Sequence, residues 1–202
     1  MTVDVSVSTF TVPLVSVAGW VVVHQRVDGS MDFNRSWAEY RNGFGDAAAA
    51  NGSFWLGNEA IHQLTVGSTG SCRLRVEVLT SITRQWYSAE YDRFSVDKET
   101  NSYAISVAGY SGDAGDAMNV AGTDTSQNGE YFSTFDHLPL DWNSNRLKCA
   151  LVDGGGWWFN NCGKNCFTCV YNVTNKAYIW GTISSSRPYT VLAMSRMMVK
   201  CT

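Results

Sequence analysis

A change in amino-acid composition and periodicity near residue 109 constrains the fold more than any other feature of the chain. Before it, short β-branched stretches such as residues 20–27, 73–79 and 86–94 alternate with turn residues, a pattern typical of half-buried strands. From residue 109 to 156, Gly, Asp, Asn and Ser dominate and no periodicity is sustained. An irregular segment of this length is uncommon unless it forms a binding surface or is disordered, and its aromatic residues indicate order.

Two helix signals lie among the expected strands. Ser36 and Glu39 form a capping box, and Gly43 can end the helix that it starts. A second short helix fits residues 58–64. The residues therefore predict an α+β fold that is mostly β, with short helices and one long irregular lobe.

Charge and hydropathy exclude several classes of partner. The chain has 15 Lys and Arg against 18 Asp and Glu, a formal net charge of −3, and its basic residues are scattered singly. We therefore expect no nucleic-acid partner. No apolar run approaches the roughly 18 to 20 residues that span a bilayer, so we also expect no membrane span. The N-terminus lacks the basic start and leucine-rich stretch of a secretory signal.

The cysteines allow three interpretations. Cys162, Cys166 and Cys169 form a C-x3-C-x2-C spacing, which could hold a four-iron cluster, half of a zinc site or disulfides. Six cysteines is an even number, and alternating βα units, which such cluster enzymes use, are missing, so disulfides are favoured. Potential N-glycosylation sites at Asn34, Asn51 and Asn172 fit a secreted protein.

Catalytic and metal motifs are sparse. The three histidines are isolated and no HExxH, GxSxG or P-loop pattern occurs, so we expect no enzymatic activity. Asp136 and Asp141 lie in the acidic segment FSTFDHLPLD, which could hold calcium or be solvated. Aromatic residues crowd residues 157–180, where they could line a shallow pocket for an acetyl or sugar group or form a small core.

Several long blocks resemble one known family. The segment WVVVHQRVDGSMDFNRSWAEYRNGFGD, followed in order by FWLGNEAIHQLT, LRVEV, VAGYSGDAGDAM and CALVDGGGWWFNNC, is similar to the fibrinogen C-terminal domain family. That family includes ficolins, tachylectins, angiopoietins and tenascins, and the resemblance covers residues 19–202. It implies a twisted antiparallel central sheet and a loop-rich ligand-binding lobe.

The resemblance also implies domain boundaries. We expect residues 1–18 to be a divergent N-terminal strand that replaces the family's cysteine-bridged subdomain. The central sheet would come from residues 19–108 and a C-terminal strand at 189–199, and the lobe from residues 109–188.

The family's ligand and calcium residues can be placed on this sequence one by one. Asn161, Cys162 and Gly163 match its Asn-Cys-His run, with glycine where the family has the imidazole. Tyr171 and Tyr178, with Trp180, are the nearest aromatic candidates for its acetyl pocket. The calcium loop usually reads DxDND; Asp136 takes the first position, Leu138 the second Asp position, and Asp141 is a candidate substitute.

The resemblance implies one disulfide directly, between Cys149 and Cys162. A local Cys166–Cys169 bridge and a strand-linking Cys72–Cys201 bridge would then satisfy all six cysteines.

Two functions follow as hypotheses. The first is a secreted lectin of innate immunity that binds acetylated sugars or microbial surface polysaccharides, with weak sites multiplied by oligomerisation. The alternative is a protein-binding module of the receptor-ligand or matrix type whose sugar pocket has decayed.

Overall fold

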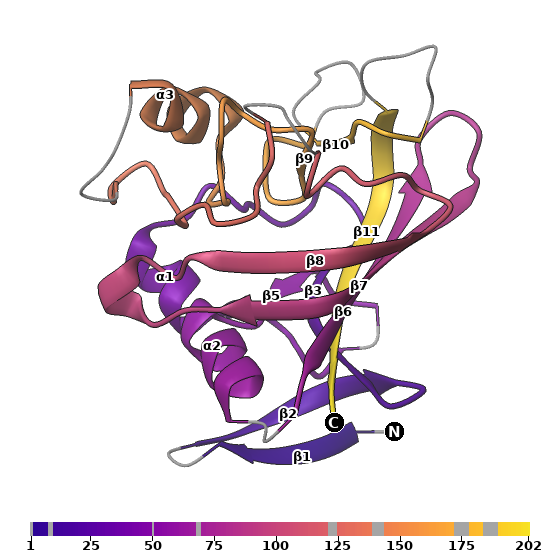
Figure 1. Cartoon of the computed structure of the whole chain (residues 1–202), viewed down its shortest axis with the longest axis vertical. Helices are drawn as coiled ribbons and strands as arrows, with labels where there is room; N and C mark the ends of the chain where they lie inside the picture. Colours follow the sequence, from indigo (N-terminus) through magenta and orange to yellow (C-terminus); the bar gives the residue numbers. More distant parts are fainter. Residues whose placement is uncertain are drawn as a thin grey trace.

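A computed structural model describes residues 2–7, 10–49, 51–67, 70–120, 125–138, 144–171, 178–183 and 190–202 (Figure 1). Its centre is an antiparallel sheet, as the sequence predicted. The strand order is β1 (Thr2–Val7), β2 (Phe10–Val17), β3 (Trp20–Arg26), β11 (Thr190–Cys201), β6 (Cys72–Thr80), β7 (Trp86–Val96) and β8 (Ile105–Gly112). Short strands β4 (Phe44–Gly45), β5 (Phe54–Trp55), β9 (Asn165–Cys166) and β10 (Ile179–Trp180) extend it.

Alternation along β6 explains why this segment is a strand. Leu74, Val76 and Val78 are completely buried on one face of the sheet. Arg75 and Glu77 point to the other face, where Arg75 also pairs with Glu90 of β7 at 2.5 Å. Apolar burial on one face and cross-strand ion pairs on the other fix the register of the sheet.

Helices α1 (Trp37–Asn42) and α2 (Asn58–Val66) lie where the sequence predicted them. The capping box is formed: Ser36 Oγ accepts from the Glu39 N–H, and a Glu39 carboxylate oxygen accepts from the Ser36 N–H at 2.9 Å. Helix α2 packs against β7, and α1 packs against α2. A 3-10 turn, η1 (Glu99–Asn101), precedes β8.

Two elements differ from the sequence-based expectation. Residues 1–18 were expected to be one strand, but β1 and β2 pair as a hairpin from Thr2 with Val15 to Val7 with Phe10. In the sequence, the polar pair of residues 8 and 9 is the one break in the apolar–polar alternation of residues 3–12. The segment expected to be irregular contains helix α3 (Ser144–Asp153). Leu151 and Val152 of α3 are exposed while Ala150 is buried. The Gly, Asp, Asn and Ser residues that dominate residues 109–156 set the expectation of an irregular segment.

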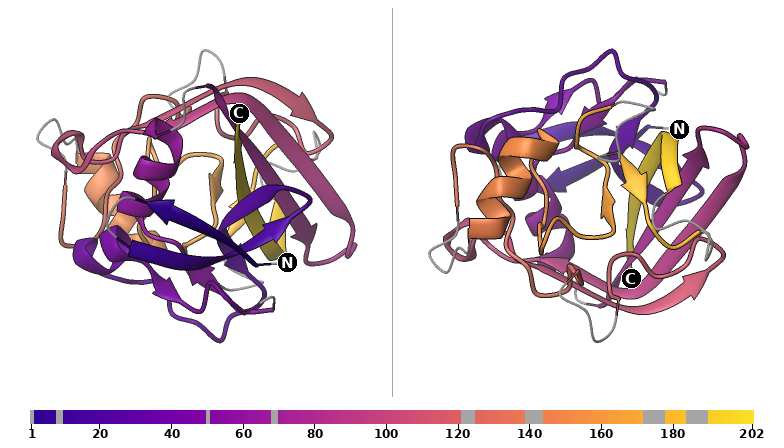
Figure 2. Two further views of the ribbon diagram at one scale, coloured as in Figure 1. Left: turned by 90° about the horizontal axis from the view of Figure 1, so that it is seen from below. Right: turned by 90° about the horizontal axis from the view of Figure 1, so that it is seen from above.

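The lobe and the N-terminal hairpin lie at opposite ends of the sheet. Helix α3 with β9 and β10 stands above β8, and the β1–β2 hairpin lies below, near the C-terminus (Figure 1; Figure 2 shows both ends). Four Trp side chains, of residues 55, 157, 158 and 180, are almost completely buried at the base of the lobe. Within the described residues, no helix is both long and apolar enough to cross a membrane.

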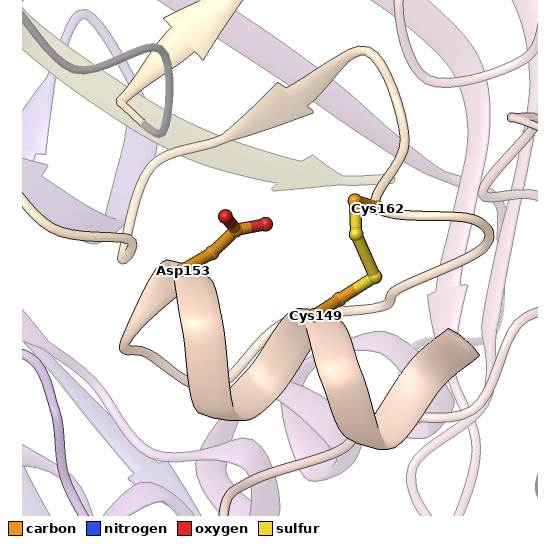
Figure 3. A group of neighbouring side chains, drawn as sticks. All are labelled: Cys149, Asp153 and Cys162. Atoms are coloured by element: carbon orange, nitrogen blue, oxygen red, sulfur yellow. A yellow bond between two sulfur atoms is a disulfide. The ribbon is translucent and has the colours of Figure 1, made fainter. Parts of the chain in front are cut away.

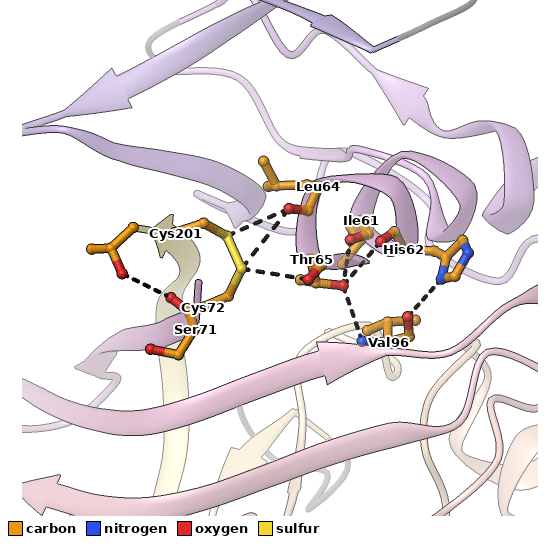
Figure 4. Close-up of a disulfide and its surroundings, with 9 residues drawn as sticks. Ile61, His62, Leu64, Thr65, Ser71, Cys72, Val96 and Cys201 are labelled. Carbon is orange, nitrogen blue, oxygen red and sulfur yellow. Dashed lines mark hydrogen bonds between the residues drawn. A yellow bond between two sulfur atoms is a disulfide. The ribbon is translucent and has the colours of Figure 1, made fainter. Parts of the chain in front are cut away.

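The Cys72–Cys201 disulfide joins the adjacent ends of β6 and β11 (Figure 4). The two residues are directly opposite in the strand register, with their Cα atoms 4.0 Å apart. The Cys201 sulfur lies 3.4 Å from the Leu64 carbonyl oxygen of α2. Nearby, Thr65 Oγ1 accepts from the Val96 N–H of β7 at 3.2 Å. The end of α2 therefore contacts both the β6–β11 disulfide and β7.

Candidate functional site

Three disulfides are present: Cys72–Cys201, Cys149–Cys162 and Cys166–Cys169. They are the pairs expected above. Because Cys162, Cys166 and Cys169 all belong to disulfides, none of them offers the thiolate that zinc or an iron–sulfur cluster requires. The two metal interpretations of the C-x3-C-x2-C spacing are therefore excluded by the structure.

The Asn161–Gly163 segment forms a tight, partly exposed turn on the lobe. Asn161, Cys162 and Gly163 have φ values of 44°, 59° and 71°, and the Gly163 N–H donates to the Asn160 carbonyl at 2.8 Å. Positive φ at both central residues is the geometry of a type I′ turn. It costs about 1 kcal/mol or more for each non-glycine residue, and the disulfide from Cys162 to α3 helps to hold it.

Asp153, at the end of α3, faces the Cys149–Cys162 disulfide (Figure 3). These three side chains lie close enough to suggest a metal site by spacing alone, but bonded sulfurs are not thiolates. The carboxylate of Asp153 has no hydrogen bond or ion pair with the described residues. Burial raises the pKa of Asp153 above its ordinary value. It is a partly buried carboxyl group without a cationic partner among those residues.

An apolar surface flanks Asp153. Leu151, Val152 and Val170 are 57%, 67% and 41% exposed. The Val170 N–H donates to the Asp153 carbonyl at 2.7 Å, which holds the segment after β9 against the end of α3. We call these three side chains the α3 apolar surface. Single exposed apolar residues are ordinary, whereas contiguous exposed apolar side chains mark interaction sites, and these three are a candidate for one.

The structure corrects the expected roles of Tyr178 and Trp180. Both are completely buried, so neither touches a ligand in this conformation. The Trp180 Nε1–H donates to the Ala114 carbonyl at 2.9 Å and its ring stacks on Phe167, with centroids 5.6 Å apart. The Tyr178 hydroxyl donates to Ser195 Oγ at 2.8 Å. These aromatic residues form the core beneath the lobe.

Tyr171 differs from these two residues because it is only partly buried. Its hydroxyl donates to the Ala193 carbonyl at 2.9 Å, and its ring lines a pocket of about 270 Å³. The other lining residues are Arg26, Gly29, Ser30, Met31, Asp32, Phe33, Asn34, Gly154 and Val170. We call it the Arg26 pocket. The sequence carries no signal for this pocket, because its lining residues come from β3, the following loop and the distant lobe.

A second hollow, of about 220 Å³, lies on the solvent face of the sheet. It is lined by Arg75, Glu77, Trp86, Tyr87, Ser88, Asp113 and Arg196. Its charges are matched internally, since Arg75 and Arg196 both pair with Glu77.

The isolated histidines within the sheet and helix have structural partners. His24 Nε2 lies 3.2 Å from Ser195 Oγ, and burial lowers the pKa of His24 to about 3, so it is neutral. His62 Nδ1 lies 2.8 Å from the Val96 carbonyl oxygen.

The proposed calcium residues are only partly described. Asp141 lies outside the described residues. Asp136 is exposed, and its Oδ1 accepts from the Trp37 N–H at 2.9 Å and from Thr134 Oγ1 at 2.7 Å. Asp136 therefore satisfies one of the free N–H groups at the start of α1. Leu138 lies two residues further on and has no ligand oxygen in its side chain.

We expect Asp136→Ala to lower the free energy of unfolding by about 1 kcal/mol in chelator, because the α1 N–H group loses its acceptor. Urea denaturation followed by circular dichroism measures this loss. Repeating it in calcium tests the metal: an extra loss in calcium shows that Asp136 holds the ion. No loss in chelator would contradict the capping role.

Comparison with known proteins gives concordant results. Residues 13–201 match the model of the family described as fibrinogen beta and gamma chains, C-terminal globular domain. The human fibrinogen alpha chain is 44% identical over 153 residues, which are 73% of this chain and 17% of that protein. Protein scabrous of Drosophila melanogaster is 37% identical over 182 residues, 90% of this chain and 20% of that protein. The sequence thus spans about a fifth of the length of these two relatives.

Solved structures agree on the fold. The fibrinogen-like globe domain of human ANGPTL6 superposes with a TM-score of 0.83 at 27% identity, covering 100% of this chain and 89% of that one. A lamprey fibrin D-dimer complexed with the peptide Gly-His-Arg-Pro-amide gives a TM-score of 0.76 at 31% identity. That match covers 94% of this chain and 64% of the other.

Proposed function

Because this protein belongs to the family of C-terminal globular domains of the fibrinogen beta and gamma chains, we propose that it is an extracellular, non-enzymatic module that recognises a protein or peptide ligand. Three disulfides support an oxidising, extracellular location. One observation carries the choice of ligand class: the unpaired carboxylate of Asp153 beside the α3 apolar surface.

The chemistry of this surface suits a cationic, partly apolar peptide. A partly buried carboxylate attracts an ammonium or guanidinium group more strongly than an exposed one, because less water screens it. Leu151, Val152 and Val170 supply exposed apolar area next to it. In the related lamprey complex the ligand is the peptide Gly-His-Arg-Pro-amide, which carries an arginine. This peptide is therefore a suitable first probe.

We expect Asp153→Asn to weaken binding of Gly-His-Arg-Pro-amide at least tenfold, measured by isothermal titration calorimetry. The reason is the loss of a charge-assisted contact in a partly dehydrated site, worth about 1.5 to 3 kcal/mol. Asp92→Asn, which removes an exposed carboxylate on β7, is the matched control and should change affinity less than twofold. Equal effects of the two substitutions would contradict a specific role for Asp153.

Measuring the stability of Asp153→Asn distinguishes a loss of binding from a loss of folding. The raised pKa of Asp153 means that its ionised form destabilises the folded state at pH 7. This cost disappears as the pH falls through the raised folded pKa toward the unfolded value. Asp153→Asn should therefore be at least as stable as the wild-type protein at pH 7.

A second candidate function is the binding of acetylated sugars or microbial surface polysaccharides. The observation that favours it is the partly exposed Asn161–Gly163 turn, whose left-handed residues lie where the resemblance places the acetyl pocket. Against it, Tyr178 and Trp180 are buried and glycine replaces the family's imidazole at Gly163. Under this candidate function, Asp136 would bind calcium and oligomerisation would multiply weak sugar sites. Titrating the protein with acetylated glycans, in calcium and in chelator, tests it.

A further inference from the structure

Arg26 is a buried cation without an acidic partner among the described residues. Its side chain is only 3% exposed although it ends β3 at the edge of the lobe. Nη1 donates to two main-chain carbonyls, of Phe167 at 3.1 Å and of Cys169 at 2.5 Å. No carboxylate lies within ion-pair distance of it in the described part of the sequence.

Aromatic rings enclose the guanidinium. Its Cζ atom lies 4.5 Å from the ring centre of Phe33, 4.9 Å from that of Tyr178 and 5.2 Å from that of Tyr171. Cation–π contacts and carbonyls stabilise the charge only in part. The Nε–H group is buried without a hydrogen-bond partner, and an unsatisfied charged donor of this kind is costly.

Arg26 itself lines the Arg26 pocket. At about 270 Å³ it has room for a carboxylate and one apolar side chain. One wall is closely packed: a Cβ atom at Gly29 would lie only 2.7 Å from the Tyr171 ring, so the loop packs directly on that ring. Met31 and Val170 give the walls apolar character.

Asp32 also lines the pocket, and its charge must be considered. It is exposed, and its Oδ1 accepts from the Asn34 N–H at 2.8 Å. Water screens an exposed carboxylate, so its repulsion of an anion at the buried guanidinium is weak. At the rim it instead favours a ligand that carries a positive charge a short distance from its anionic end.

We propose that the Arg26 pocket binds the C-terminal carboxylate of a peptide or protein ligand whose last side chain is apolar. This proposal deepens the proposed function and rests on it. The carboxylate accepts from the guanidinium N–H groups that the Phe167 and Cys169 carbonyls leave free. The terminal side chain packs on Met31 and Val170, and the preceding residues continue over the α3 apolar surface. A basic side chain earlier in the ligand pairs with the carboxylate of Asp32.

The test uses the tripeptide acetyl-Lys-Val-Leu with a free carboxylate and the same peptide as its C-terminal amide. Calorimetry on the whole protein should give at least tenfold tighter binding of the acid, and the amide resonances of Gly29 and Tyr171 should shift in NMR spectra. Equal affinities, no binding of either peptide, or shifts confined to other regions would overturn the proposal.

Matched variants make the test specific. Val170→Glu places a like charge at the pocket rim without disturbing the core, and should weaken binding of the acid at least fivefold. Val66→Glu alters a side chain that is 59% exposed on α2 and should leave it unchanged. Equal sensitivity to the two substitutions would overturn the proposal.

A parallel titration with Gly-His-Arg-Pro-amide separates this proposal from the proposed function. That peptide has no free carboxylate, so its binding depends on Asp153 and not on the Arg26 pocket. If it binds while acetyl-Lys-Val-Leu does not, the carboxylate site is excluded and the peptide-recognition function stands.

Discussion

Replacing Cys72 and Cys201 together by Ala lowers the free energy of unfolding by about 4 to 5 kcal/mol. The two cysteines are 129 residues apart in the sequence, and a crosslink that closes so long a loop strongly restricts the unfolded state. In the folded state the bridge fastens β6 to β11 beside the end of α2 (Figure 4). Urea unfolding without reductant, followed by tryptophan fluorescence, measures the loss.

The Cys149→Ala, Cys162→Ala pair is the matched control. Its cysteines are 13 residues apart, so the expected loss is about 3 kcal/mol. In both bridges one cysteine is buried and the other partly exposed, so packing losses are similar. A larger loss for the short loop than for the long one would contradict this ranking.

Trp180→Ala lowers the free energy of unfolding by about 3 to 5 kcal/mol, because it leaves a cavity in a packed core. The ring is completely buried against Phe167, and its Nε1–H group satisfies the Ala114 carbonyl. The same denaturation experiment measures this loss. A residue that served an open sugar pocket would show the opposite pattern: little change in stability and a large loss of glycan binding.

Trp86→Ala is the control for Trp180. Trp86 is 50% exposed on the sheet, so its truncation should cost less than about 1 kcal/mol. Similar losses for the two variants would mean that the aromatic residues of the lobe do not form the core described above.

Local signals predicted the sheet and the first two helices. The capping box of Ser36 and Glu39 starts α1, and the alternation of β6 puts Leu74, Val76 and Val78 in the core. Helix α3 was missed because it lies in a segment that is dominated by Gly, Asp, Asn and Ser, which predicts irregular structure. The exposure of Leu151 and Val152 makes α3 a candidate binding surface.

The candidate site was less predictable than the fold. The lobe and its Asn161–Gly163 turn were placed by resemblance, but clustering of aromatic residues does not say which way each ring points. Tyr178 and Trp180 point inward, and only Tyr171 reaches a pocket. Arg26 gave no signal because its partners, Phe167 and Cys169, are more than 140 residues away in the sequence.

The proposed function requires that the lobe recognise a peptide through Asp153 and not an acetylated sugar through an aromatic pocket. The most direct test titrates the wild-type protein and Asp153→Asn with Gly-His-Arg-Pro-amide and with N-acetylglucosamine, in calcium and in chelator. We predict saturable peptide binding that the substitution weakens at least tenfold, and no saturable binding of the sugar. Saturable sugar binding that survives Asp153→Asn, with no binding of the peptide, would contradict the account.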